Sequence, residues 1–267
     1  MKNLSCEICG GLKKVIFEKK ILTKYVVKYF QCKNCKIIDT EKPYWLNEAY
    51  EFAITNSDVG LVSRNLLLVR ATKIINLLKI FSNKNRCLDY AGGYGLFVRM
   101  MRDLGFNFYR QDKFCINLFA KYFDLEDLNS KNKQFSFITC FELFEHFYDV
   151  NIELEKILEL GSTIFFTTSL IDGKMNNDIK NWWYISPETG QHITFYSKES
   201  LKILAQNHGL NFYSDGEGMH IFTKNRYLFN PFIMVSPIVK LLDLFGNKSK
   251  FVQNDYKYIY IKNVGKR

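Results

Sequence analysis

The stretch Leu88-Asp89-Tyr90-Ala91-Gly92-Gly93-Tyr94-Gly95 decides the fold of this 267-residue chain. An apolar start, an acid and then three glycines in four positions are typical of a buried parallel strand that turns abruptly into a helix. Such a turn needs glycine because the backbone adopts angles that side chains forbid and approaches a ligand closely. Asp112 follows 17 residues after the last glycine, beyond the next apolar run. A carboxylate there would accept both hydroxyls of a ribose, so the pattern predicts a nucleoside site.

The same loop argues against a dinucleotide ligand. The dinucleotide fingerprint Gly-x-Gly-x-x-Gly fails at Val98, which stands where the third glycine belongs. Asp89 would repel a pyrophosphate and favours a cationic ligand instead. An acid before a glycine loop resembles the first motif of class I S-adenosylmethionine-dependent methyltransferases, with Ala91 in place of their first glycine. The resemblance implies S-adenosylmethionine as the cofactor, and the residues expected to bind it are Asp89, Ala91, Gly93, Gly95, Asp112 and Phe141.

Strand and helix patterns alternate along the centre of the chain. We expect strands at 86–89, 106–110, 135–140 and 162–168, and helices at 95–104, 115–121, 151–159 and 198–207. Such alternation predicts a parallel sheet covered by helices on both faces, which is an α/β, Rossmann-like doubly wound fold. We divide the chain into a zinc-binding module (1–42), a helical connector or lid (43–81), the methyltransferase core (82–223) and a C-terminal extension (224–267). Asp58 or Ser63 is the expected cap of the long connector helix.

Four of the seven cysteines form two Cys-x-x-Cys pairs, Cys6 with Cys9 and Cys32 with Cys35, separated by 22 residues. This spacing is close to that of a four-cysteine zinc ribbon, in which four thiolates close a tetrahedral shell around a structural Zn²⁺. The segment between the pairs is rich in Val, Ile, Tyr and Phe and predicts a hairpin over 15–30. Two disulfides or free thiols are the alternative interpretation.

Two segments carry the candidate catalytic residues. Phe141 to His146 follows the strand at 135–140, and ligands bind beyond the carboxyl ends of such strands. His192 lies in an aromatic-rich loop after the strand at 162–168, where a histidine could deprotonate an acceptor. The candidates for catalysis are His192, His146 and Glu145. For either histidine the alternative is a structural role, in which the side chain anchors its loop. The Asn/Asp-Pro-Pro-Tyr/Phe and Pro-Cys motifs of base-modifying methyltransferases are absent.

The formal charge of +10 is carried by the two ends of the chain. Residues 1–50 hold 10 Lys/Arg against 5 Asp/Glu, residues 224–267 hold 9 against 2, and residues 51–223 hold 18 against 20. Solubility is the preferred explanation of the basic ends, and an anionic partner is the alternative. Neither a signal peptide nor a transmembrane stretch is recognisable, so we expect a cytoplasmic protein. The apolar run over 229–245 predicts core or homodimer packing, with a membrane-surface helix as the alternative, and 256–261 predicts an edge strand.

Taken together, the cysteine pairs, the glycine loop, Glu145-His146 and Gly190-Gln191-His192 resemble a group of bacterial sugar methyltransferases with zinc-binding amino-terminal modules. The resemblance implies methyl transfer to a hydroxylated small molecule, most simply a nucleotide-linked sugar or a surface-glycan precursor, at oxygen or carbon. Two other functions remain open. One is a zinc-ribbon protein that binds or methylates RNA, with basic residues on one face (Lys13, Lys14, Lys19, Lys20, Lys24 and Lys28). The other is an inactive scaffold that only binds the cofactor.

Overall fold

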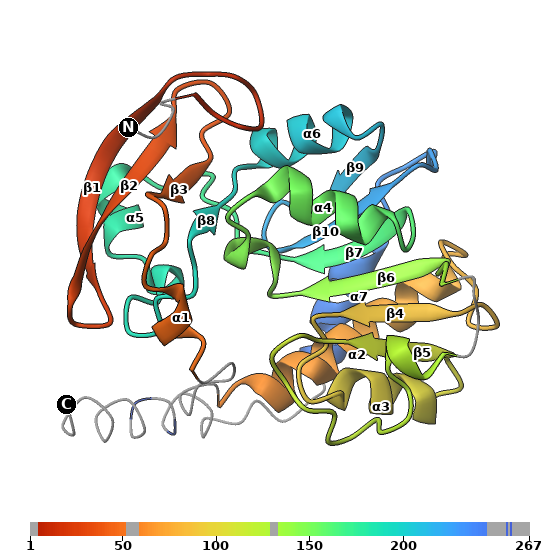
Figure 1. Ribbon diagram of the computed structural model, residues 1–267. Coiled ribbons are helices and arrows are strands. Elements are labelled where there is room, and N and C mark those ends of the chain that lie inside the picture. The colour runs from red at the N-terminus through yellow and green to blue at the C-terminus, as the bar shows by residue number, and fades with distance from the viewer. Residues whose placement is uncertain (1–4, 52–58, 129–132, 245–254, 256, 258–267) are drawn as a thin grey trace.

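The core of the molecule is a six-stranded sheet in the order β5-β4-β6-β7-β10-β9 (Figure 1). The computed structural model describes residues 5–51, 59–128, 133–244, 255 and 257. The four predicted strands are found as β4 (Cys87–Tyr90), β5 (Phe108–Gln111), β6 (Phe137–Phe141) and β7 (Thr163–Thr167), and they are parallel. The prediction of an all-parallel sheet was wrong at one edge. There β10 (Met219–Thr223) runs antiparallel to both β7 and β9 (Asn211–Ser214).

Helices cover both faces of this sheet, as the α/β prediction required (Figure 1). One layer consists of α4 (Val150–Leu158) and α6 (Lys198–Asn207), and the other of α2 (Leu61–Leu77), α3 (Leu96–Asp103) and α7 (Phe232–Leu244). Successive strand residues point to opposite faces. Leu88 and Ile138 therefore pack in the first layer, while their neighbours Cys87 and Phe137 pack in the second. Nearly continuous apolar strands follow from burial on both sides.

A second, antiparallel sheet has the order β1-β2-β3-β8. Its hairpin, β1 (Lys13–Ile21) and β2 (Tyr25–Cys32), matches the hairpin expected at 15–30, and β3 (Ile38–Thr40) extends it. The fourth strand, β8 (Thr194–Phe195), comes from the segment between β7 and α6. That segment also holds α5 (Asn176–Lys180) and a 3-10 turn, η3 (Trp183–Ile185), while α1 (Leu46–Ala49) leads away from β3. The amino-terminal sheet is therefore built from two distant parts of the chain.

The prediction of a helix after β5 was wrong because side chains in this segment form hydrogen bonds with nearby backbone groups. The helix expected at 115–121 is an irregular loop before a 3-10 turn, η1 (Leu125–Asp127). In this loop Asp112 accepts backbone N–H groups of Phe114 and Cys115, and the amide of Asn117 bonds both backbone groups of Ala120. Such bonds compete with helix formation.

The cap of α2 also differs from the expectation. Gly60 is the N-cap residue, and because glycine has no side chain the helix has no side-chain cap. Ser63 lies inside the first turn, where its hydroxyl donates to the Gly60 carbonyl at 3.0 Å. Asp58 lies outside the described residues, as does most of the edge strand expected at 256–261, of which Lys257 is described and is helical.

Helix α7 is continuous through Pro237. Phe232, Val235 and Val239 are buried against the second layer, whereas Ile233 and Leu241 are exposed. Across the described part of the chain, every helix is too short or too polar to cross a lipid bilayer.

Candidate active site

A cavity of about 1120 Å³ opens where β4, β5 and β6 end. Its wall is formed by the glycine loop, the segment after β5, the η2 turn (Phe144–His146) and the loop between η3 and β8. The cavity brings together most of the candidates from the sequence, namely Asp89, Ala91, Gly93, Asp112, Phe141, His146 and His192. Gly95 and Glu145 are not among its lining residues. Gly95 forms the turn below the loop, and Glu145 is buried behind the wall.

The glycine loop is shaped by contacts that leave no room for side chains. A Cβ on Gly92 would lie 2.6 Å from Oδ2 of Asp89, and one on Gly95 would lie 2.7 Å from Oδ1 of Asn117. Gly95 has a φ of 84° and Ala91 a φ of 60°, so the alanine occupies a conformation that favours glycine. The guanidinium of the buried Arg110 donates to the carbonyl of Gly93 from below. The loop is thus held as a cradle that backbone atoms line.

Asp89 is an acid with almost no access to water, at 3% exposure. Its Oδ1 accepts a hydrogen bond of 2.6 Å from the hydroxyl of Thr139 on β6. Burial raises the pKa of the Asp89 carboxyl to about 7, which outweighs the lowering effects of Thr139 and Arg110. A cation in the cavity would favour the ionised form of this carboxyl.

Asp112 ties the glycine loop to the loop after β5. Its Oδ2 accepts the backbone N–H of Gly93 at 2.8 Å. Its Oδ1 accepts those of Phe114 at 2.8 Å and Cys115 at 2.7 Å. A carboxylate offers about four lone-pair sites, so an acceptor position remains on Oδ2 for a hydroxyl in the cavity.

The histidines on the other side of the cavity meet because their segments are bonded together. Ile193 donates its backbone N–H to the carbonyl of Glu145 at 2.9 Å, and the hydroxyl of Thr194 donates to the carbonyl of Phe147 at 2.6 Å. The rings of His146 and His192 consequently meet edge to face, with centroids 4.9 Å apart.

One nitrogen of each ring has a defined partner. His192 donates from Nδ1 to the backbone carbonyl of Tyr184 at 2.6 Å, which leaves its Nε2 with a lone pair. His146 pairs through Nδ1 with the hydroxyl of Tyr50 at 2.8 Å. Burial lowers the pKa of His192 to about 4 and the pKa of His146 well below its usual value, so both rings are neutral at pH 7.

Glu145 lies behind these histidines and is completely buried. Among the described residues no group meets normal hydrogen-bond geometry with either carboxylate oxygen, although the hydroxyls of Tyr184 and Thr168 lie near enough to lower the pKa of Glu145. The neighbouring hydroxyls of Thr168 and Tyr184 lie 3.3 Å from each other and form a hydrogen bond between themselves. Burial, reinforced by the charge of Glu142, raises the pKa of Glu145 to about 8.

The amino-terminal part of the chain holds the loop that carries His192. The indole of Trp45 donates to the carbonyl of Gly190 at 2.8 Å, and the amide of Gln191 donates to the carbonyl of Ala49 at 2.8 Å. A Cβ on Gly190 would lie 2.6 Å from Cγ2 of Ile21 on the hairpin. These contacts fix the turn before His192 against α1 and β1.

Sequence analysis did not identify Tyr50 or Phe114 as part of the site, although both line the cavity beside Glu142, which lies in the predicted segment from Phe141 to His146. Tyr50 stacks on Phe114 with ring centroids 4.7 Å apart. Glu142 has a φ of 50° and accepts from the hydroxyl of Thr167 at 2.7 Å. A positive φ at a residue other than glycine can mark a functional site in a structure, but the amino-acid sequence gives no indication of it.

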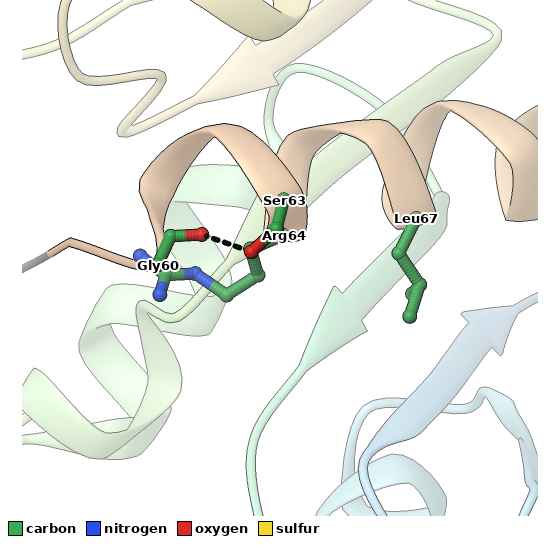
Figure 2. Close-up of a pocket in the computed structure, with 4 residues that line it drawn as sticks. All are labelled: Gly60, Ser63, Arg64 and Leu67. Atoms are coloured by element: carbon green, nitrogen blue, oxygen red, sulfur yellow. Dashed lines mark hydrogen bonds between the residues drawn. The ribbon is translucent and has the colours of Figure 1, made fainter. Parts of the chain in front are cut away.

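The beginning of α2 closes one side of the cavity. Gly60 and Arg64 line the main cavity and also a smaller hollow of about 320 Å³ beside it. Ser63 and Leu67 complete the lining of this smaller hollow. Figure 2 shows Arg64 turning back toward Gly60 at the start of the helix, beside the bond from Ser63 to the Gly60 carbonyl. The positive charge of Arg64 also contributes to the low pKa of His192.

The four predicted metal ligands, Cys6, Cys9, Cys32 and Cys35, lie together. Their sulfur atoms are all within 4.8 Å of one another, with 3.6 Å between Cys6 and Cys35 and 3.4 Å between Cys9 and Cys32. Four thiolates about 2.3 Å from a tetrahedral zinc would be about 3.8 Å apart, so the cluster fits this ion.

The two cysteine pairs also share one backbone geometry. Cys6 donates its N–H to the carbonyl of Gly11, and Cys32 donates to that of Ile37, at 2.8 and 2.9 Å. The residue after each second cysteine has a left-handed backbone, with a φ of 70° at Gly10 and 64° at Lys36. The knuckles are therefore two copies of one turn.

The lysines of the amino-terminal hairpin do not form one basic face. Lys13 is buried and forms an ion pair with Asp39. Lys19 donates to the carbonyl of Lys180, and Lys24 forms an ion pair with Glu48 at 2.5 Å. Three of the six lysines proposed for an RNA-binding surface therefore form ion pairs or hydrogen bonds within the protein.

A family model described as a methyltransferase domain matches residues 65–214. The chain belongs to this methyltransferase family. The match covers the glycine loop, Asp112, both histidines and the whole segment from α3 to β9, and with it the chain is an S-adenosylmethionine-dependent methyltransferase of α/β fold. The methyltransferase matches no curated protein.

Solved structures similar to the methyltransferase share little sequence with it. The plantazolicin methyltransferase BpumL, in complex with a monoazolic desmethylPZN analog and SAH, is 11% identical with a TM-score of 0.46, over 76% of this chain and 88% of that one. WbdD, bound to a kinase inhibitor, is 12% identical with a TM-score of 0.34, over 70% and 45%. Magnesium protoporphyrin IX methyltransferase from Synechocystis is 9% identical with a TM-score of 0.42, over 67% and 92%.

Proposed function

We propose that this methyltransferase acts on a hydroxylated small molecule, most simply a nucleotide-linked sugar or a glycan precursor. The observation that carries the proposal is one cavity lined by two chemically distinct groups of residues. We assign Asp89, Asp112 and the glycine cradle to a cofactor end, and His146 and His192 to an acceptor end. A nucleoside cofactor and an acceptor would meet between them.

The cofactor end fits S-adenosylmethionine. This cofactor supplies a methyl group activated by a sulfonium, so the protein has to position the acceptor and take up its proton. The backbone of Gly93 would border the cofactor, the free acceptor position of Asp112 would receive a ribose hydroxyl, and the buried carboxylate of Asp89 would favour its positive charge. Ala91, Gly95 and Phe141 complete the predicted binding residues.

The acceptor end is polar. Glu142, Ser186, Glu188 and Thr189 line it together with the histidines, and Trp183 is 75% exposed there. These hydroxyl and carboxylate groups suit a ligand with several hydroxyls. The lone pair on Nε2 of His192 makes this residue the proposed base or acceptor anchor, and the turn bonded to Trp45 and Ala49 holds it in position.

We further propose that Cys6, Cys9, Cys32 and Cys35 hold a structural zinc ion. Two knuckles of equal geometry and the sulfur spacing support this, and four thiolates would leave no position for a substrate on that ion. The division of the chain at 42, 81 and 223, a cytoplasmic location and homodimer formation through the apolar residues of α7 stay predictions.

The proposal is tested by incubating the full-length protein with S-adenosylmethionine and nucleotide sugars and measuring S-adenosylhomocysteine. We expect His192→Ala to lower turnover about a hundredfold, because the base is lost, with nearly unchanged cofactor affinity. His208→Ala is the control, since this histidine bonds Asn151 outside the cavity. Near-normal turnover of His192→Ala would refute the role of this histidine. Cofactor binding without S-adenosylhomocysteine production from any sugar acceptor would favour an inactive scaffold.

A further inference from the structure

The three residues Glu145, His146 and His192 form a cluster of metal-ligand type that is separate from the cysteines. One ligand atom from each of the three lies within 4.8 Å of those from the other two. Two histidines and a carboxylate are the ligand set of catalytic zinc sites and of non-haem iron sites, which leave positions open for a substrate. We propose that this cluster binds a divalent transition-metal ion at the acceptor end of the cavity.

The buried carboxylate is the first independent observation. Glu145 has no exposure to water, and among the described residues no group meets normal hydrogen-bond geometry with either of its oxygens, although the hydroxyls of Tyr184 and Thr168 lie near enough to lower its pKa. Buried carboxyl groups are normally protonated, paired with a cation or bound to a metal, because an uncompensated charge in the interior is strongly unfavourable. Among the described residues Glu145 takes part in no salt bridge, and Glu142 beside it carries the same sign of charge. A dication between this carboxylate and the two imidazoles would supply the missing partner.

The hydrogen bonds of the two histidines are the second observation. Histidines that bind metals usually donate their other ring N–H to a carbonyl, a carboxylate or another oxygen, which fixes the ring and its tautomer. His192 makes this bond from Nδ1 to the Tyr184 carbonyl, and His146 pairs from Nδ1 with the Tyr50 hydroxyl. Nε2 is then the nitrogen of His192 that is available to an ion, and the same holds for His146 in the tautomer that donates from Nδ1 to Tyr50.

The position of the cluster gives the ion its open side. His146 and His192 line the cavity while Glu145 lies behind them. The protein thus provides ligands from one side, and remaining coordination positions face the cavity, where hydroxyl oxygens of a ligand could enter. Any use of the ion in methyl transfer rests on the proposed function, in which His192 would then orient the acceptor through the metal. Binding of the ion itself does not.

The test is a titration of the full-length protein, first saturated with zinc at the cysteines, with CoCl₂ in the absence of cofactor and acceptor. We expect one further equivalent of Co²⁺ to bind, with visible absorption from nitrogen and oxygen ligands and without a thiolate charge-transfer band. Glu145→Gln and His192→Gln should each weaken this binding by more than about tenfold. His208→Gln should not change it, because His208 lies outside the cluster.

Several results would overturn the metal site. These are the absence of a second equivalent, a second equivalent with a thiolate charge-transfer band, or unchanged Co²⁺ affinity in Glu145→Gln. If Glu145→Gln does not fold, the affinity of His192→Gln decides in the same way. Failure of the cobalt titration would leave S-adenosylhomocysteine production untouched, and a protein without methyl transfer could still bind cobalt, so the two proposals fail separately.

Discussion

At the residue scale, Asp89 combines a raised pKa with a position beside the glycine loop. Its ligand-free pKa of about 7 lies above the ordinary value near 3.9, so the folded protein prefers the protonated carboxyl. The contribution of this group to stability is therefore present at low pH and is lost as the pH rises from about 4 to about 7. A cationic cofactor favours the opposite, ionised form.

We therefore predict that S-adenosylmethionine binds more tightly as the pH rises through 7. Between pH 6 and pH 8 the ionised fraction of Asp89 increases about tenfold, and the dissociation constant should fall by a similar factor. Calorimetry at the two pH values measures this change. Asp89→Asn is the control, because it shares the titration of the ligand itself but should lack the contribution of the carboxyl. An equal pH dependence in both proteins would contradict the role of Asp89.

Asp112 supports a second prediction at this scale. Asp112→Ala should weaken S-adenosylmethionine binding by more than about 1.5 kcal/mol, or about tenfold in the dissociation constant, because a charge-assisted bond to the ribose is lost. The structure adds a second cause, since the carboxylate also holds Gly93 and the loop after β5. Asp103→Ala, an exposed acid on α3, is the control. Unchanged affinity in a folded Asp112→Ala protein would remove Asp112 from the cofactor site.

At the element scale, two glycines with the same backbone conformation but different surroundings allow the effect of backbone strain to be measured separately from that of packing. Gly190 has a φ of 65° and Gly209 a φ of 66°. A Cβ on Gly190 would lie 2.6 Å from Ile21 and 3.2 Å from Trp45, whereas one on Gly209 would meet nothing within 4 Å. Alanine at either position is strained by the left-handed backbone conformation. Only at Gly190 would its Cβ also collide with the hairpin.

We predict that Gly209→Ala lowers the free energy of unfolding by about 1 kcal/mol. Gly190→Ala should lower it by about 2–4 kcal/mol, because overpacking adds to the same backbone strain. Denaturant unfolding of the two variants and the wild type measures the difference. Equal losses in the two variants would mean that the contact between the hairpin and the turn before His192 contributes nothing.

The elements that the sequence predicted correctly are those with a strong local signal. The strand before the glycines is an apolar run that ends in turn residues, and the helix over 198–207 and the hairpin between the cysteine pairs have apolar periodicity. The loop after Asp112 was mistaken for a helix because side-chain bonds from Asp112 and Asn117 to the backbone are invisible to periodicity. The antiparallel strands β9 and β10 were missed although they are as long as the predicted strands. They follow each other without a helix between them, so the alternation of strand and helix patterns that located the other strands gave no signal for this pair.

The residues of the candidate site likewise divide into those with a local sequence signal and those that only the tertiary fold brings together. The glycine loop and Asp112 follow from one short motif, and the structure places their side chains and backbone along one cavity. That Tyr50 would pair with His146 could not be predicted, because 96 residues separate them and only the tertiary fold brings them together. Whether these residues bind cofactor and acceptor stays a prediction until the substitutions are measured.

At the scale of the whole molecule, the cysteine cluster is continuous with the main core. Cys6, Cys32 and Cys35 pack in the same apolar cluster as α4 and α6. Hydrogen bonds add to this, from Asn207 to the carbonyl of Ile8 at 2.8 Å and from Ser197 to that of Cys35. A change at the metal ligands should therefore reach beyond the amino-terminal sheet.

We predict that the wild type contains one zinc per chain beyond any ion at the histidines, and that Cys32→Ser loses it. The variant should unfold in a single transition with a melting temperature about 10 °C lower or more, since a loss of several kcal/mol has this effect in a domain of this size. Elemental analysis and calorimetry measure both quantities. Cys115→Ser, outside the cluster, should keep the zinc. A metal-free wild type would refute the zinc site, and separate transitions would refute the shared core.

The strand β8 has a consequence for synthesis on the ribosome. The amino-terminal sheet receives its fourth strand only at Thr194, about 150 residues after β3 ends at Thr40. At translation rates of about 5–20 residues per second, the edge of β3 would wait on the order of ten seconds for its partner. During that time Ile38 and its neighbours expose an unpaired strand edge on the nascent chain, which is a template for aggregation. Early metal capture by the four thiols would hold the unfinished sheet in shape until the rest of the chain emerges.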